Sequence, residues 1–376
     1  MYRFYNPVRT YLGNGCFGNI KEIIAEAVGT PKNIVLLVWS ESVLEMEIVQ
    51  NFLKEDAYAV KPIIFTNANP TVENLFTLYT EAKAVTYDLV VAIGGGSVLD
   101  AAKTLACLQN MEIQSEEDVR NIINEKTYAS PKCKWIGVPT TSGTGSEVTC
   151  WATIWDMKKG KKLSVERQDN YAAAAVVDAT FTASMPMSLA VSSALDAVAH
   201  ATESYWANAR NPVTKALALY AIKAIMESID DLITNYGNTK AGDVMAMGSM
   251  IAGLAFSNTR TTACHSISYP LTMHYGVPHG VAVSMLVAPM IVCNDAYLED
   301  KEDLLDAFGV KCVEEIQEKM DAIHKKAGIK SRLCDWNVAK EDIDFLVKNA
   351  FTKGRIDNNP RVLCEADVRT ILQNIY

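Results

Sequence analysis

Leu89-Val-Val-Ala-Ile-Gly-Gly-Gly-Ser-Val-Leu-Asp-Ala-Ala-Lys103 passes from a β-branched run through three glycines into a helical pattern. A strand, a glycine turn and a helix in this order form the repeating unit of an α/β fold. Other short apolar runs, separated by amphipathic stretches, predict further buried strands at 34–39, 62–65, 135–138 and 172–177. Strands and helices therefore alternate, which predicts a parallel, doubly wound sheet.

The second half of the chain has a different pattern. From Pro186 onward the strand signal disappears. Helical periodicity replaces it near 188–208, 212–235, 240–257, 280–297, 311–327, 340–352 and 366–375. We therefore predict an α/β domain at 1–183 and an all-helical domain at 184–376, with the boundary between Phe181 and Pro186.

Composition excludes several classes of partner. The 376 residues carry a formal net charge of −9 without a long Lys/Arg run, which argues against nucleic acid and anionic membranes as partners. Nine cysteines without C-x-x-C pairs favour a reducing cytoplasm and no disulfides. The N-terminus lacks an apolar signal region, and no stretch approaches ~20 uncharged apolar residues, so neither export nor membrane spanning is expected.

Histidines are scarce and clustered. Of the five in the chain, four lie between His200 and His279. Asp196 and His200 are four apart in a helical segment, so both side chains face one side of the helix. With His265 and with His279 in a Pro-His-Gly loop, they predict a site for Fe²⁺, Zn²⁺, Mn²⁺, Co²⁺ or Ni²⁺. The alternative is a set of ordinary capping or core histidines, which is the commoner role of any single histidine.

Two turns have the composition of a phosphate cradle. Gly94 to Ser97 joins a buried strand to a helix N-terminus, where free N–H groups and the helix dipole attract anions. Pro139 to Glu147 follows the next strand in the same way. Neither turn is a G-x-G-x-x-G motif or a P-loop. Each alone could be a tight turn without a ligand, but ligands of open α/β sheets bind at the carboxyl ends of strands, which favours a cofactor site.

Four motifs in this order resemble the iron-dependent, or group III metal-dependent, alcohol dehydrogenases. They are Gly94-Gly-Gly-Ser-Val-Leu-Asp-Ala-Ala-Lys103, Pro139-Thr-Thr-Ser-Gly-Thr-Gly-Ser-Glu-Val-Thr149, Leu195-Asp-Ala-Val-Ala-His-Ala-Thr-Glu203 and Pro278-His-Gly280. The resemblance covers essentially the whole chain. It implies a Rossmann-like N-terminal domain, a helical metal-binding C-terminal domain of the dehydroquinate synthase-like type, and a nicotinamide cofactor in the cleft between them.

Carried over residue by residue, the resemblance implies site residues of three kinds. The metal ligands would be Asp196, His200, His265 and His279. The diphosphate contacts would come from Gly94, Gly95, Gly96 and Ser97, with Asp100 in support. Contacts to the diphosphate and the nicotinamide end would come from Thr140, Thr141, Thr144 and Thr149.

The cofactor and the proton donor stay open. NAD-preferring members of the family often carry an Asp after the second strand, where this chain has Ser40-Glu41. Ser40 would not repel a 2′-phosphate but Glu41 would, so the cofactor is NAD(H) or NADP(H). Many members also carry a second His four residues after the third ligand, where this chain has Tyr269. Tyr269 and the ligand His265 are the catalytic candidates, and His274 matches no ligand position.

The stretch from Phe256 to Thr272 resembles the branch that reduces phosphonoacetaldehyde, and neighbours that act on sulfoacetaldehyde. Arg260 lies five residues before a predicted ligand, so its guanidinium could bind a tetrahedral anion, although it could instead cap a helix or pair with an acid. Trp151 and Phe256 are candidate pocket walls. Arg355 and Arg361 are weaker anion candidates.

The resemblance implies metal-assisted hydride transfer from the reduced nicotinamide to a small anionic aldehyde, in a homodimer. We expect phosphonoacetaldehyde as substrate. The alternatives are sulfoacetaldehyde, a general short-chain alcohol dehydrogenase, a dehydroquinate synthase-like lyase, and a non-catalytic nucleotide-binding protein.

Overall fold

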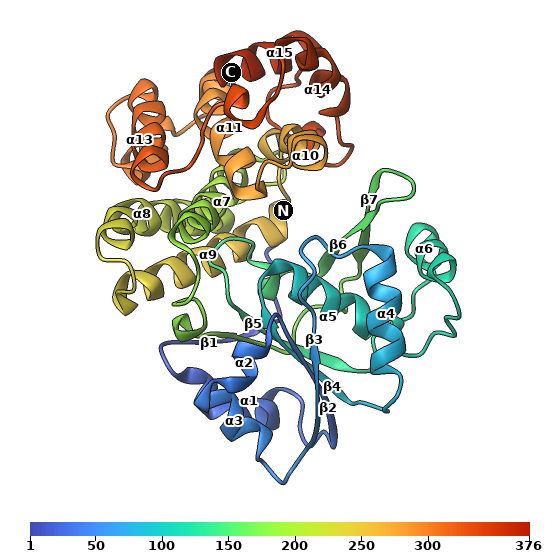
Figure 1. Cartoon of the computed structure of the whole chain (residues 1–376). Coiled ribbons are helices and arrows are strands. Elements are labelled where there is room, and N and C mark those ends of the chain that lie inside the picture. The colour runs from blue at the N-terminus through green and yellow to red at the C-terminus, as the bar shows by residue number, and fades with distance from the viewer. The chain divides into compact units, whose positions relative to one another are not determined.

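The computed structural model describes residues 1–376. The chain divides into two compact units, coloured along the sequence in Figure 1. The sheet unit contains residues 6–141 and 145–182, and the helical unit contains residues 1–5, 142–144 and 183–376. The change from one unit to the other at 182/183 lies next to the sequence boundary. The inclusion of 1–5 and 142–144 in the helical unit had no sequence signal.

The sheet unit is built on six parallel strands in the order β1-β8-β5-β4-β2-β3. Their bounds are β1 Arg9–Leu12, β2 Asn33–Val38, β3 Ala59–Ile64, β4 Leu89–Gly94, β5 Lys134–Pro139 and β8 Ala174–Val177. The predicted parallel sheet is confirmed. β3 lies on one side of β2, and the next strand in the sequence, β4, lies on its other side. The direction in which strands are added to the sheet therefore reverses between β2 and β4. Such a reversal is where open α/β sheets bind ligands.

Helices cover both faces of this sheet. They are α1 Ile20–Ala27, α2 Glu41–Glu45, α3 Glu47–Leu53, α4 Val72–Ala82, α5 Gly96–Leu108 and α6 Glu116–Glu125. Alternate residues of β2 enter opposite cores: Val35 and Leu37 pack with α4 and α5, while Ile34 and Leu36 pack with α1 and α3. This division gives the doubly wound arrangement. An antiparallel hairpin, β6 Trp151–Asp156 and β7 Lys161–Glu166, adds to the α5 side and was not predicted.

The helical unit is formed around α7. Its helices are α7 Met187–Trp206, α8 Pro212–Thr234, α9 Thr239–Thr259, α10 Ala263–Tyr275, α11 His279–Asn294, α12 Lys301–Phe308, α13 Val313–Lys326, α14 Ile343–Asn349 and α15 Glu365–Asn374. Almost every residue of α7 from Ala190 onward is buried. A helix that is buried on all sides can present polar residues only to an internal site, and α7 carries Asp196 and His200.

One helix is notably apolar. By length and composition alone, the stretch 279–297, formed by α11 and the short turn after it, is long and apolar enough to cross a membrane, although it includes Ser284 and Asp295. About two thirds of its apolar window, 67%, is buried within the fold. Burial of this extent is typical of a helix that passes through a protein core.

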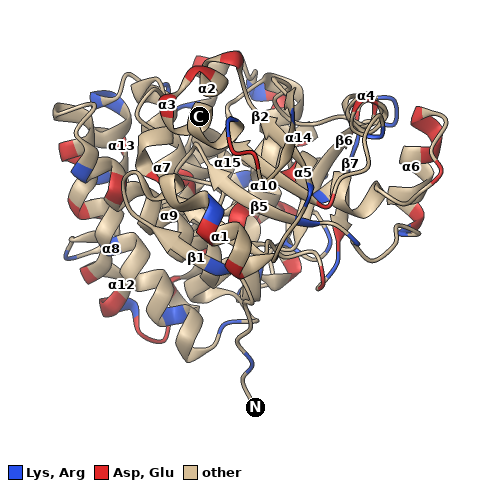
Figure 2. Cartoon of the chain, turned by 90° about the horizontal axis from the view of Figure 1, so that it is seen from below, with Lys and Arg blue, Asp and Glu red and all other residues tan.

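Charged residues are mixed along the chain. Figure 2 shows basic residues scattered among acidic ones, and the first turn of α6 carries Glu116, Glu117 and Asp118. With a net charge of −9, the general field of the protein repels anions. A small anionic ligand therefore needs a local cation.

Candidate metal centre and cofactor turns

The predicted metal ligands surround one carboxylate oxygen. Oδ1 of Asp196 lies 3.8 Å from Nδ1 of His200, 3.6 Å from Nε2 of His265 and 3.9 Å from Nε2 of His279. The donor atoms of Asp196, His265 and His279 all lie within 4.8 Å of one another. These distances are too long for hydrogen bonds. Ligand atoms that are each about 2.1 Å from a common ion lie roughly 3–4 Å apart, so the spacing suits a metal.

Three atoms of this cluster are buried and have no hydrogen-bond partner: Oδ1 of Asp196, Nδ1 of His200 and Nε2 of His265. Buried polar atoms are almost always paired, and an unpaired one costs free energy. Three orphans in contact with one another indicate a missing common partner. A divalent cation fits a set of one carboxylate and several imidazoles.

The charge state of the cluster also suits a cation. Burial raises the pKa of Asp196, but the imidazoles of His200, His265 and His279 outweigh it and hold the pKa below its usual value. Burial lowers the pKa of His200 to about 4, although Asp196 opposes this shift. At neutral pH the site therefore contains a carboxylate and a neutral imidazole, the forms that bind metals.

A second carboxylate, to which the sequence assigns no role, orients one of the predicted ligands. Glu203 is fully buried on α7 and accepts hydrogen bonds from Nδ1 of His265, from Oγ1 of Thr262 at 2.7 Å and from the backbone N–H of Cys264 at 2.7 Å. Burial lowers the pKa of His265, but Glu203 and Asp196 outweigh it and raise the pKa above its usual value. The hydrogen bond to Glu203 keeps a proton on Nδ1, so Nε2 is the nitrogen that would bind a cation once the cation displaces its proton, a common arrangement of metal-binding histidines.

The spacing of α7 could have revealed Glu203. Asp196, His200 and Glu203 stand at positions i, i+4 and i+7, which share one face of a helix. Glu203 ends the motif Leu195–Glu203, but its hydrogen-bond partners could not be found from the sequence because Thr262 and Cys264 lie at the start of α10, far from α7 along the chain.

A glycine brings the last predicted ligand to α7. A Cβ at Gly280 would lie 2.3 Å from the carbonyl oxygen of Ser192, so only glycine lets the start of α11 approach α7 this closely. His279, the first residue of α11, is thereby placed beside Asp196. Its side chain is 37% exposed, whereas the other predicted ligands are buried. Tyr269 lies nearly parallel to the His279 ring, with centroids 6.3 Å apart.

Other predicted residues of the helical unit lie around this cluster or outside it. Phe256 stacks on the His200 ring at a centroid distance of 4.2 Å. Arg260 follows the last turn of α9 and is half-buried. His274 is exposed, and its ring meets the edge of Phe345 on α14 at 4.9 Å, outside the cluster.

The two weaker anion candidates differ. Arg361 donates to Oδ1 of Asp367 at 2.6 Å and to the carbonyl of Cys293 at 3.1 Å, so its guanidinium has a structural role. Arg355 donates to the carbonyl of its neighbour Gly354 at 3.1 Å.

In the sheet unit the two predicted cofactor turns are neighbours. β4 pairs with β5 so that Gly94 stands opposite Pro139, and the N–H of Thr140 donates to the carbonyl of Gly94 at 3.1 Å. Gly95 caps α5, and a Cβ there would lie 3.1 Å from the Thr141 side chain. Gly96 is the first residue of that helix, so its free N–H points out of the helix N-terminus.

Two serines complete this edge of the sheet. Ser97 accepts a hydrogen bond from the N–H of Asn69 at 3.0 Å. Ser40, just after β2, pairs its hydroxyl with Ser42 at 2.6 Å. Ser40 and the glycine turn therefore follow the two strands between which the strand order reverses.

A buried lysine ties the second turn to α5. Lys103 donates to Oγ of Ser146 at 2.6 Å, to Oγ1 of Thr149 at 2.9 Å and to the carbonyl of Trp151 at 2.9 Å. Asp100 accepts from Ser146 at 2.7 Å and from the N–H of Thr153 at 2.8 Å. Thr149 is only 1% exposed. Asp100 and Thr149 thus hold the second turn in place. Trp151, half-buried, begins β6.

Residues 142–144 pack against α7 within the helical unit. A Cβ at Gly143 would lie 2.7 Å from the carbonyl oxygen of Ser193, so this contact also requires glycine. Thr144 therefore belongs to the unit that carries the metal cluster, while Thr140, Thr141 and Thr149 belong to the sheet unit.

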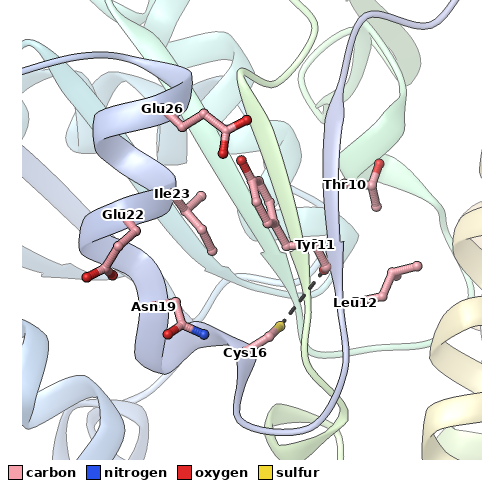
Figure 3. Close-up of a pocket in the computed structure, with 8 residues that line it drawn as sticks. All are labelled: Thr10, Tyr11, Leu12, Cys16, Asn19, Glu22, Ile23 and Glu26. Carbon is pink, nitrogen blue, oxygen red and sulfur yellow. Dashed lines mark hydrogen bonds between the residues drawn. The ribbon is translucent and has the colours of Figure 1, made fainter.

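A separate cavity of about 380 Å³ lies beside the edge strand β1 and helix α1 (Figure 3). Its walls include Tyr11, Cys16, Glu22 and Glu26, and Figure 3 shows the Cys16 thiol turned toward the backbone of Tyr11. None of the predicted site residues lines it.

Comparison with known families covers nearly all of the chain. Residues 7–179 match the iron-containing alcohol dehydrogenase family. Residues 190–376 match the C-terminal part of the Fe-containing alcohol dehydrogenase family.

Individual relatives agree. The chain is 29% identical to sulfoacetaldehyde reductase of Bilophila wadsworthia over 81% of each protein, and 31% identical to lactaldehyde reductase of Escherichia coli over 75% of each. Among solved structures, sulfoacetaldehyde reductase from Bifidobacterium kashiwanohense in complex with NAD⁺ superposes with a TM-score of 0.90 at 26% identity. That comparison covers 100% of this chain and 98% of the other.

Proposed function

The chain belongs to the iron-containing alcohol dehydrogenase family and is an NAD(P)-dependent oxidoreductase, and we propose that it reduces a short aldehyde with an anionic tail to the alcohol. The proposed substrate is phosphonoacetaldehyde, and sulfoacetaldehyde is the alternative. Similarity to two sulfoacetaldehyde reductases supports the class. Both aldehydes have two carbons and a tetrahedral anionic group, so one cation site would serve either.

Arg260 carries this proposal. It stands four residues after Phe256, whose ring stacks on His200, and five before His265. A guanidinium on this segment supplies the local cation that a protein of net charge −9 needs for an anionic substrate. Its planar fork matches the oxygens of a phosphonate or sulfonate.

The other residues receive roles from their positions. Asp196, His200, His265 and His279 would hold the divalent metal, most simply Fe²⁺, which polarises the aldehyde oxygen when bound. Tyr269, whose ring lies beside the half-exposed His279, would deliver a proton to that oxygen, directly or through water.

The cofactor site is proposed at the point where the strand order reverses. The glycine turn after β4 and Ser40 after β2 would hold the dinucleotide, NAD(H) or NADP(H), with its diphosphate at the N-terminus of α5.

The test is a kinetic comparison of phosphonoacetaldehyde, sulfoacetaldehyde and propanal. Arg260→Met keeps the aliphatic stem and removes the charge. A charge-assisted hydrogen bond contributes ~1.5–3 kcal/mol, so we expect kcat/KM to fall roughly ten- to a hundredfold for both anions and to change little for propanal.

The uncharged aldehyde is the internal control. An equal loss on all three substrates would mean that Arg260 supports the fold and not the tail. A wild-type preference for propanal over both anions would leave a general short-chain alcohol dehydrogenase. The ratio of kcat/KM for phosphonoacetaldehyde to kcat/KM for sulfoacetaldehyde decides which of the two is the preferred substrate.

A further inference from the structure

Arg260 has a strained backbone. Its φ of 63° and ψ of 176° fall in a region that is populated almost only by glycine. Lys126 and Asn337 also have positive φ, but their ψ values of 36° and 25° place them in the milder left-handed helical region. Glycine would form the same turn without strain. Arginine at this position therefore lowers the stability of the folded state. We expect its side chain to compensate with a role in function.

One side chain holds this conformation from outside. Nδ2 of Asn358 donates to the carbonyl of Thr259 at 2.8 Å and to the carbonyl of Thr261 at 3.2 Å. The first carbonyl belongs to the peptide before Arg260 and the second to the peptide after Thr261, so a single amide holds the backbone on both sides of the turn. The N–H of Arg260 itself donates to the carbonyl of Phe256 at 2.7 Å.

The far side of the turn is also fixed. Oγ1 of Thr262 donates to Glu203, which holds His265. Asn358 therefore sets the direction in which the Arg260 side chain leaves a backbone that is anchored to the metal cluster. Loss of the amide would free the turn to relax, while the anchor at Glu203 would keep the metal ligands in place.

We propose that Asn358 is a positioning residue for Arg260 and thereby determines the preference for aldehydes with an anionic tail. The inference rests on the proposed function of Arg260. It adds a residue from the segment before α15, almost a hundred positions away in sequence, to the specificity of the site.

The chain offers a matched control. Nδ2 of Asn208 donates to the carbonyls of Asn359 at 3.0 Å and Asp357 at 3.4 Å. Asn208 thus ties the same segment to the end of α7 without contacting residues 259–261. Asn208→Ala loosens the segment, whereas Asn358→Ala also removes the hold on Arg260.

The experiment compares wild type, Asn358→Ala, Asn208→Ala, Arg260→Gly and the Asn358→Ala/Arg260→Gly double variant. For the better anionic aldehyde and for propanal we measure kcat and KM, together with bound metal. Asn358→Ala should lower kcat/KM for the anion roughly tenfold, mainly through KM, and leave propanal turnover and metal content unchanged. Asn208→Ala should keep the wild-type ratio of the two substrates. In the Arg260→Gly background, Asn358→Ala should cause no further loss of selectivity.

Thermal unfolding gives a second readout that needs no substrate. Asn358→Ala should lower the Tm of the wild type by roughly 2–6 °C, and that of Arg260→Gly by less, because glycine adopts the turn without help.

The outcomes are separable. A wild type that does not prefer anions overturns the proposed function, and with it the effect on selectivity. A wild type that prefers them, with an Asn358→Ala variant that keeps the preference, overturns the inference alone. Equal selectivity loss in Asn208→Ala, or equal Tm losses in the wild-type and Arg260→Gly backgrounds, would also overturn it.

Discussion

Replacement of Glu203 by Gln should weaken metal binding without unfolding the protein. The carboxylate now accepts the proton on Nδ1 of His265 and so leaves Nε2 free to bind a metal. Gln can keep one acceptor oxygen for Thr262 and Cys264, but its amide nitrogen would then face His265 and donate to Nδ1. The proton of the ring would move to Nε2. That tautomer cannot ligate a metal through the atom that faces Asp196.

The size of the effect follows from these contacts. Removal of a partner that orients a metal-bound histidine typically costs 10–100-fold in affinity, so the dissociation constant should rise by about that factor or more. In Glu203→Ala, the hydroxyl of Thr262 and the N–H groups of Cys264 and His265 lose their acceptor. Each buried donor left unpaired costs ~1–3 kcal/mol, so Ala should destabilise the protein by several kcal/mol more than Gln.

Metal affinity is measured by competition with a chromogenic chelator, and stability by urea unfolding of the metal-free protein. Glu147→Gln is the matched control, because Glu147 is a buried glutamate of the sheet unit. It should leave metal affinity unchanged. Glu203→Gln protein that binds metal as tightly as the wild type would refute the tautomer argument.

Three further results are expected. His200→Ala should lose metal and turnover, whereas His274→Ala should keep full metal content by elemental analysis, because its ring packs outside the cluster. Burial raises the pKa of Glu147 to about 7, so the folded state holds this proton more tightly than the unfolded state. The resulting stability is present below pH ~4.5, is lost as the pH rises to about 7, and amounts to at most roughly 3 kcal/mol. Urea unfolding at pH 5 and pH 8 should show this slope, and Glu147→Gln should lack it. Gly95→Ala should weaken NADH binding by fluorescence titration with metal content unchanged, since the added Cβ meets Thr141 at 3.1 Å and fills the approach to the helix N-terminus; unaltered affinity would argue against a phosphate site there.

Local patterns predicted the central strands of the sheet because these strands are buried on both faces, whereas the largely exposed edge strand β1 was missed. β2 and β4 are continuous apolar runs bounded by polar residues or glycine, so their positions follow from composition alone. α10 was missed because Pro270 lies inside it, and proline normally ends a helix. The β6–β7 hairpin was missed because its buried residues, among them Ala152, Ile154 and Leu163, form only short alternating patterns, and charged residues separate the two strands.

In the candidate site too, residues paired within one helix could be predicted, whereas contacts between distant segments could not. Asp196 and His200 are paired by the repeat of one helix, and Glu203 stands on the same face, so all three were accessible to sequence reasoning. The contacts that give Glu203 and Asn358 their roles join segments 59 to 99 residues apart. Neither contact has a local pattern. The positive φ of Arg260 is likewise invisible, because the sequence at that position suggests no glycine-like turn. Predicted ligands that share one face of a helix can therefore be found from their spacing in the sequence. Residues that orient these ligands or select the substrate cannot, because their contacts join segments far apart in the chain.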